Sequence, residues 1–262
     1  MHLKREFNAI LTIAFRDLTK LLRDRPRLFA SLIFPLIFIG VLGGGLQASL
    51  GKVAGFHLLT FTFVGVFAQT LFQSTASGIT FLIQDRESDF SQEIFVSPIS
   101  RYTIIFGKIV GETLVSYAQV IGVVVFGLIF GAHITPPQLL LMVLTGLVSS
   151  LLGGAFGTLI LANMGNIRSA QQVFPFFIFP QIFLAGVFNP VKDLPPILLI
   201  LSRLSPMTYA VDFVRGIFYW GTPDYDKVVL YHPLIDFAII SVLFITMLSI
   251  GTILFARNEK NR

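Results

Sequence analysis

The chain has 262 residues, of which 54% are hydrophobic and 13% are charged, and its formal net charge is +5. About a quarter of the residues of a typical soluble protein are charged, so this chain has too few charges to cover a soluble globule. It contains no cysteine, which excludes a disulfide framework, a zinc–thiolate site and a thiol nucleophile. The composition therefore predicts a protein whose main solvent is lipid.

A basic amphipathic helix is expected over residues 3–24, ahead of the first long apolar stretch. Leu3, Phe7 and Leu11 belong to its apolar face, whereas Lys4 and Arg16 belong to the opposite face. Such a helix lies along an anionic membrane surface. It serves either as a topology anchor or as a collar against a cytoplasmic partner.

Six stretches are apolar and long enough to cross a bilayer, which takes about 20 residues. The fold class expected is an all-α integral membrane protein with spans at 28–48, 57–83, 104–131, 138–163, 171–188 and 234–256. We expect one transmembrane domain over residues 1–262, made of a cytoplasmic helix (1–27), the six-span body (28–256) and a cytoplasmic tail (257–262). Lysine and arginine are concentrated on the side that carries both termini, with seven before the first span. This bias predicts a multi-pass protein of the plasma (inner) membrane with both termini in the cytoplasm.

The connection between the second and third spans holds the densest charge cluster of the interior sequence. Residues 84–101 read QDRESDFSQEIFVSPISR, with an apolar patch inside the cluster. A short amphipathic helix ended by Pro98 fits this pattern. A plain loop would not need the patch, whereas a surface helix that offers Phe90 and Phe95 to another protein would.

The connection between the fifth and sixth spans, residues 188–231, is long and apolar, and prolines interrupt it. Its apolar stretches are too short to span. We expect two half-helices that dip in from the external face, with an external cap lying flat on the headgroups as the alternative. Asp212 and Arg215 are three residues apart and are expected to pair on one helix face.

No enzymatic chemistry is found in the sequence. A GxxxxGK[ST] phosphate loop is absent, so ATP is not bound by that route. Histidines are scattered near span ends, and no metal site or catalytic residue is expected. Lys108, Glu112 and Asp236 lie near span ends, where long side chains can reach the interface.

Uncharged polar and aromatic residues within the spans are candidates for a substrate pathway. The second span carries two amides four residues apart, and the fifth span combines amides with aromatic surface and two prolines. Interhelical packing and hydrogen bonding explain any one of them equally well. The candidate pathway residues are Gln69, Gln73, Gln172, Phe176, Phe179 and Phe183.

Taken together, these features resemble the permeases of ABC-2 type exporters. The stretches that carry the resemblance are IQDRESDFSQEIFVSPISRYTIIFGK (83–108) and LSPMTYAVDFVRG (204–216). Many relatives have a glycine after the acid pair of the first stretch, where this chain has Ser88 and Asp89. The resemblance covers essentially the whole chain.

The resemblance implies a homodimeric permease without enzyme activity of its own, on which two copies of a separate ABC ATPase subunit dock. ATP and magnesium would be bound by that partner, and no cofactor by this chain. Spans 1, 2 and 5 would line the path at the dimer interface, and a drug, lipid, glycolipid or polysaccharide would be exported. The implied ATPase-coupling residues are Asp85, Arg86, Glu87, Phe90, Glu93, Phe95, Pro98 and Arg101, and the implied external gate comprises Pro206, Tyr209, Asp212 and Arg215.

Three other functions remain open from the sequence: a secondary carrier or channel, a membrane-embedded enzyme acting on lipids, and a non-transporting sensor with the same topology. The shortage of ionisable groups within the spans argues against a carrier. Convergent catalytic groups for an enzyme cannot be assembled.

Overall fold

The computed structural model describes residues 2–87, 99–161 and 164–260. Within these residues all regular structure is helical, as expected. The elements are α1 (His2–Arg23), α2 (Arg25–Leu36), η1 (Ile37–Gly43), α3 (Gly44–Ala54), α4 (Leu58–Gly78), α5 (Thr80–Glu87), α7 (Arg101–Ile129), α8 (Pro136–Leu161), α9 (Ile167–Leu184), η2 (Val191–Asp193), α10 (Pro196–Leu204), α11 (Pro206–Phe218), α12 (Tyr225–Val228) and α13 (Pro233–Lys260).

Five helical segments among the described residues are long and apolar enough to cross a membrane, and they match five of the six predicted spans. Their bounds are Arg25–Ala54, Leu58–Asp85, Tyr102–Ile129, Pro136–Ile160 and Tyr225–Arg257. The first consists of α2, the π-helical η1 and α3, joined without a break in the helical backbone. The last begins at α12 and continues through α13.

The predicted fifth span corresponds to α9, which is not one of these five helices. It has 18 residues and contains Pro175 and Pro180, so it is about 27 Å long at 1.5 Å per residue. Gln171, Gln172 and Gln181 make it less apolar than its neighbours. The sixth candidate span of the structure is instead the pair α10 and α11, which is bent by 90° at Ser205.

Helix α4 forms the centre of the bundle. Most of its side chains are buried, including Phe61, Phe63 and Phe67, none of which is exposed. Helices α7, α8 and α11 pack around it. Gly153 and Gly157 of α8 lie directly against the α4 backbone, so that an added Cβ would collide with it. These two glycines, four residues apart, therefore allow a close contact between α8 and α4.

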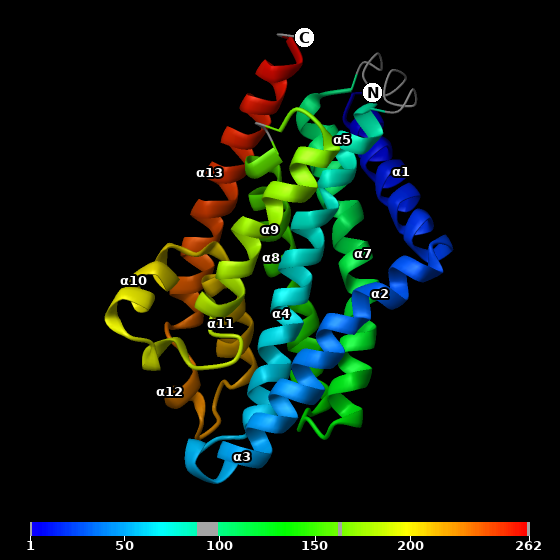
Figure 1. The fold of residues 1–262 in the computed structure, drawn as a ribbon. Helices are drawn as coiled ribbons and strands as arrows, with labels where there is room; N and C mark the ends of the chain where they lie inside the picture. The colour runs from blue at the N-terminus through cyan, green and yellow to red at the C-terminus, as the bar shows by residue number, and fades with distance from the viewer. Residues whose placement is uncertain (1, 88–98, 162–163, 261–262) are drawn as a thin grey trace.

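Both termini lie at the same end of the molecule, whereas α3 and α12 lie at the other end (Figure 1). This arrangement fits an even number of crossings. At the end with the termini, α1 packs along α7. Ala14 and Leu21 of its predicted apolar face are buried there, but Phe7 and Leu11 are exposed.

Candidate functional site

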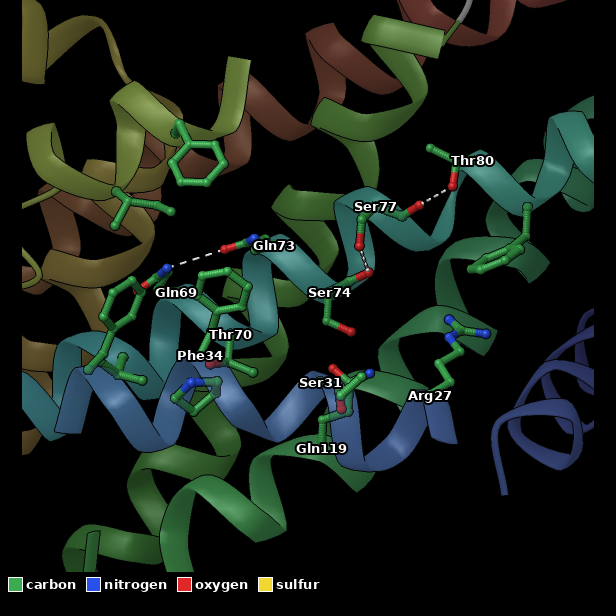
Figure 2. A pocket seen from close by; sticks show the side chains of 17 residues that line it. Arg27, Ser31, Phe34, Gln69, Thr70, Gln73, Ser74, Ser77, Thr80 and Gln119 are labelled. Atoms are coloured by element: carbon green, nitrogen blue, oxygen red, sulfur yellow. Dashed lines mark hydrogen bonds between the residues drawn. The ribbon is translucent and has the colours of Figure 1, made fainter. Parts of the chain in front are cut away.

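A cavity of about 460 Å³ lies between α2, α4, α7 and α9. This volume falls within the range of small-molecule sites. Figure 2 shows the side chains that line it. They are Arg27, Ala30, Ser31, Phe34, Pro35, Phe38, Val66, Gln69, Thr70, Gln73, Ser74, Ser77, Thr80, Phe81, Gln119, Phe179 and Ile182.

The polar groups of this cavity are held mostly by local hydrogen bonds. Ser31, Ser77 and Thr80 each donate to a backbone carbonyl three residues earlier. The Nε2 atom of Gln69 donates to Oε1 of Gln73 at 3.2 Å, and Oε1 of Gln69 is buried without a partner. The hydroxyls and amides are thus fixed in place with acceptor capacity left over.

The predicted pathway residues fall into two groups. Gln69, Gln73 and Phe179 line the cavity. Gln172, Phe176 and Phe183 lie on the exposed surface of α9, where Phe176 is 79% exposed.

A network of charged side chains joins α1, α5 and α7 at the end of the molecule that carries the termini. The Nζ atom of Lys108 lies 2.8 Å from Oδ2 of Asp17 and 3.1 Å from Oε1 of Glu112. Arg16 contacts both Asp17 and Asp85, and Lys20 reaches Oδ1 of Asp85 at 3.0 Å. Three cations balance three carboxylates, which makes burial of the group possible.

The burial of this network was not predicted. Lys108 and Glu112 were expected to reach the membrane interface, but each is only 2% exposed, and Asp17 is 3% exposed. The expectation failed because α1 covers this part of α7. Gly107 and Gly111 let α1 approach closely, and this pair of glycines beside Lys108 was the available signal.

The predicted coupling residues can be placed only in part. Asp85 belongs to the charge network, Arg86 and Glu87 end α5, and Arg101 begins α7. The other predicted coupling residues, Phe90, Glu93, Phe95 and Pro98, lie outside the described residues, as does the surface helix expected there.

The predicted gate residues lie together in α11, but the expected pairing of Asp212 with Arg215 is wrong. Asp212 accepts hydrogen bonds from the backbone nitrogens of Leu230 and Tyr231, at 2.7–3.1 Å. Arg215 donates to the carbonyl of Gly186 at 2.9 Å and stacks on the ring of Phe61. The two side chains leave α11 toward different neighbours, so both stabilise the packing of α11 separately.

The other two gate residues begin the same helix. Pro206 is its first residue, and the hydroxyl of Tyr209 donates to the carbonyl of Arg203 at 2.6 Å, across the bend between α10 and α11.

Asp236 is a further buried acid that the sequence placed at a span end. It is not exposed at all, and neither carboxyl oxygen receives a hydrogen bond from a donor. Among the described residues it is therefore a buried acid with no donor to stabilise a negative charge.

Two histidines meet at the end opposite the termini. The rings of His57 and His133 are 4.5 Å apart, and Nδ1 of His57 accepts from the backbone nitrogen of Thr60 to cap α4. Burial, together with the neighbouring His133, lowers the pKa of His57 below its ordinary value of 6.5. No cluster of three or more potential metal-ligating side chains exists among the described residues.

Three curated relatives resemble this chain, and each carries the name "Putative transport permease ycf38". The protein from Cyanophora paradoxa is 25% identical over 75% of this chain and 70% of its own length. The protein from Porphyra purpurea is 28% identical over 75% of this chain and 69% of its own length. The protein from Pyropia yezoensis is 26% identical over 81% of this chain and 74% of its own length.

A sequence model of the family described as "ABC-2 type transporter" matches residues 8–219, which include most of the amphipathic helix α1, the charge network, the cavity and the α10–α11 pair. The match covers most of the chain and agrees with the helical membrane architecture. The chain therefore belongs to the ABC-2 type transporter family, as a multi-pass membrane subunit with a role in transport.

Proposed function

We propose that this chain is the permease subunit of an ATP-driven exporter whose ATPase is a separate polypeptide. The observation that carries the proposal is the charge network of Arg16, Asp17, Lys20, Asp85, Lys108 and Glu112. It ties the N-terminal helix to the two helices that flank residues 88–98. A force applied to that segment by a docked ATPase would reach α1, α5 and α7 together.

The end of the molecule that carries the termini is the cytoplasmic end in this proposal. The concentration of lysine and arginine before the first span, where seven of them lie within the first 27 residues, supports this orientation. The segment 85–98 then serves as the coupling helix, and α1 braces the same contact from the side.

A second copy of the chain completes the substrate path. The cavity lies between the first span, the second span and α9, which are the helices that the family resemblance assigns to the dimer interface. Exposed aromatic residues flank it, with Phe34 59% and Phe179 52% exposed. Aromatic surface of this kind packs well against another protein surface.

The α10–α11 pair forms the external gate in this account. Its 90° bend at Ser205 is the geometry of a re-entrant loop or a broken span. Non-spanning backbone at membrane depth must be buried in protein, and α11 is buried along most of its length.

Affinity purification of the full chain from its native membrane in mild detergent tests the proposal. We expect a stoichiometric ATPase subunit, identified by mass spectrometry, and ATP hydrolysis by the same sample. A functional preparation without any ATPase would overturn it. Substrate flux that survives ATP depletion would then favour a secondary carrier, for which Asp236 is the first residue to test.

A further inference from the structure

The cavity between α2, α4, α7 and α9 has a charged end and an end where aromatic side chains lie beside amides. In Figure 2, Arg27, Ser77 and Thr80 gather at one end, whereas Phe34 and Gln69 lie toward the other. Arg27 and Phe38 are eleven residues apart along the first span, which corresponds to roughly 16 Å at the rise of a helix. The cavity is therefore long enough to take a headgroup and an apolar chain at different depths.

The charged end is cationic. Among the described residues that line the cavity, Arg27 is the only charged one and none is acidic. Its guanidinium lies 4.2 Å from the ring centroid of Phe81, and no ion pair of Arg27 occurs among the described residues. Stacking on a ring uses the flat face of a guanidinium and leaves its N–H donors at the edge available to an anion.

Arg27 differs in this respect from the cations nearby. Lys108 and Arg16 are engaged by carboxylates of the charge network, and Glu112 forms its ion pair with Lys108. The carboxylate of Asp24 accepts a hydrogen bond from the backbone nitrogen of Arg27 at 3.1 Å. Among the described residues, no ion pair therefore compensates the positive charge of Arg27 at the cavity wall.

The middle and far end of the cavity supply complementary surfaces. Gln69 is only 4% exposed, and its Oε1 atom has no partner, so a ligand that carries a hydroxyl or amide donor can satisfy it. Phe34 and Phe38, 6.0 Å apart between ring centroids, form an apolar wall opposite Phe179 and Ile182.

We propose that this cavity binds an amphiphile with an anionic headgroup, a phosphate or a carboxylate, held by Arg27, with its apolar chain against Phe34, Phe38 and Phe179. A cationic amphiphile of the same length is disfavoured, because it would meet the charge of Arg27 without a carboxylate in the lining. That such an amphiphile is also the transported substrate rests on the proposed function, whereas its binding to the cavity does not.

Equilibrium binding to the full chain in phosphatidylcholine nanodiscs tests the proposal, with radiolabelled dodecyl phosphate as the probe and empty nanodiscs as the blank. Unlabelled dodecyltrimethylammonium and phosphatidic acid serve as competitors. Arg27→Gln removes the charge, and Arg27→Lys keeps it without the fork of donors. Arg25→Gln is the matched control, since Arg25 lies on the same helix but is exposed and does not line the cavity.

We expect saturable binding of dodecyl phosphate that weakens about tenfold in Arg27→Gln, since hydrogen bonds to charged groups are among the stronger ones. Arg27→Lys should lose less, and Arg25→Gln should bind as the unmodified chain does. Competition by phosphatidic acid as well would identify a two-chain lipid as a ligand, whereas competition by single-chain anions alone would point to free amphiphiles.

Equal competition by dodecyltrimethylammonium, or unchanged binding to a folded Arg27→Gln variant, would overturn the proposal. Co-purification of the ATPase is followed on the same samples. If the ATPase co-purifies but anionic probes are not preferred, only the inference about the ligand is wrong. If the ATPase does not co-purify, the proposed function is wrong, regardless of the binding result.

Discussion

Removal of the Lys108 charge should detach α1 from the helix bundle. Lys108→Met would leave Asp17 and Glu112, each 3% exposed or less, facing each other without the cation that lies between them. Breaking a buried ion pair by removing one partner costs about 3–5 kcal/mol, because an uncompensated charge stays buried. Lys20→Met is the matched control, since Lys20 pairs with Asp85 from a side chain that is 56% exposed. Such a pair contributes at most about 1 kcal/mol.

The effect should be local, because α1 is joined to the rest of the molecule mainly along α7. Chymotrypsin reports on it through Phe7 and Phe15, which are 59% and 72% exposed and are unchanged by either substitution. When a segment must open before a protease can cut it, and opening and closing are fast, the cleavage rate is proportional to the population of the open form. A loss of about 3 kcal/mol therefore predicts cleavage of α1 on the order of 100-fold faster in Lys108→Met, against less than about fivefold in Lys20→Met.

A triple variant separates charge burial from packing. Lys108→Met combined with Asp17→Leu and Glu112→Leu removes all three buried charges, and apolar replacement of a buried ionic group is often close to neutral. We expect this variant to resist chymotrypsin better than Lys108→Met alone. Equal cleavage rates for Lys108→Met and Lys20→Met would show that the buried charge of Lys108 does not hold α1 on α7.

Three further outcomes are expected from thermal unfolding of the purified protein in neutral detergent. Asp236→Asn should be as stable as the unmodified chain or more stable, because Asp236 is buried and its carboxyl oxygens have no hydrogen-bond donor among the described residues; a clear loss of stability would contradict this. Stability should fall as the pH drops through 6.5, because the lowered pKa of His57 disfavours its charged form in the folded state. His57→Asn should reduce this pH dependence, since asparagine does not titrate but keeps an acceptor for the backbone nitrogen of Thr60. Gly153→Ala should destabilise the protein by about 1–3 kcal/mol, because the added methyl group meets the α4 backbone, and an unchanged melting temperature would contradict the close contact.

The spans could be predicted from the sequence because each depends on one local property, a run of apolar residues. The fifth span was the least well predicted, since Gln171, Gln172 and Gln181 dilute the apolar character of α9 and its two prolines interrupt its backbone bonding. The paired α10 and α11 were expected from the spacing of Pro195 and Pro206, which begin or precede each helix.

The charge network and the cavity depend on contacts between distant segments, which no local pattern encodes. Asp17 and Lys108 are 91 residues apart, and neither segment has a sequence pattern that identifies the other as its neighbour. The same holds for Asp212 and Arg215, whose helical spacing is right for a pair but whose partners come from other segments. Asp212 bonds to the segment before α13. Arg215 bonds to the α9–α10 connection and stacks on α4. Gln69, Gln73 and Phe179 were chosen by residue type, and the arrangement of α2, α4 and α9 is what brings them to one cavity.

Reconstituted transport tests whether this chain is the permease of an ATP-driven exporter. The chain and its co-purified ATPase would be placed in proteoliposomes, and both ATP hydrolysis and ATP-dependent movement of an amphiphilic probe would be measured. We expect movement that requires ATP, and loss of that movement in Phe90→Asp while the permease remains folded and inserted. Full ATP-dependent transport by Phe90→Asp, or probe movement that is indifferent to ATP, would contradict it.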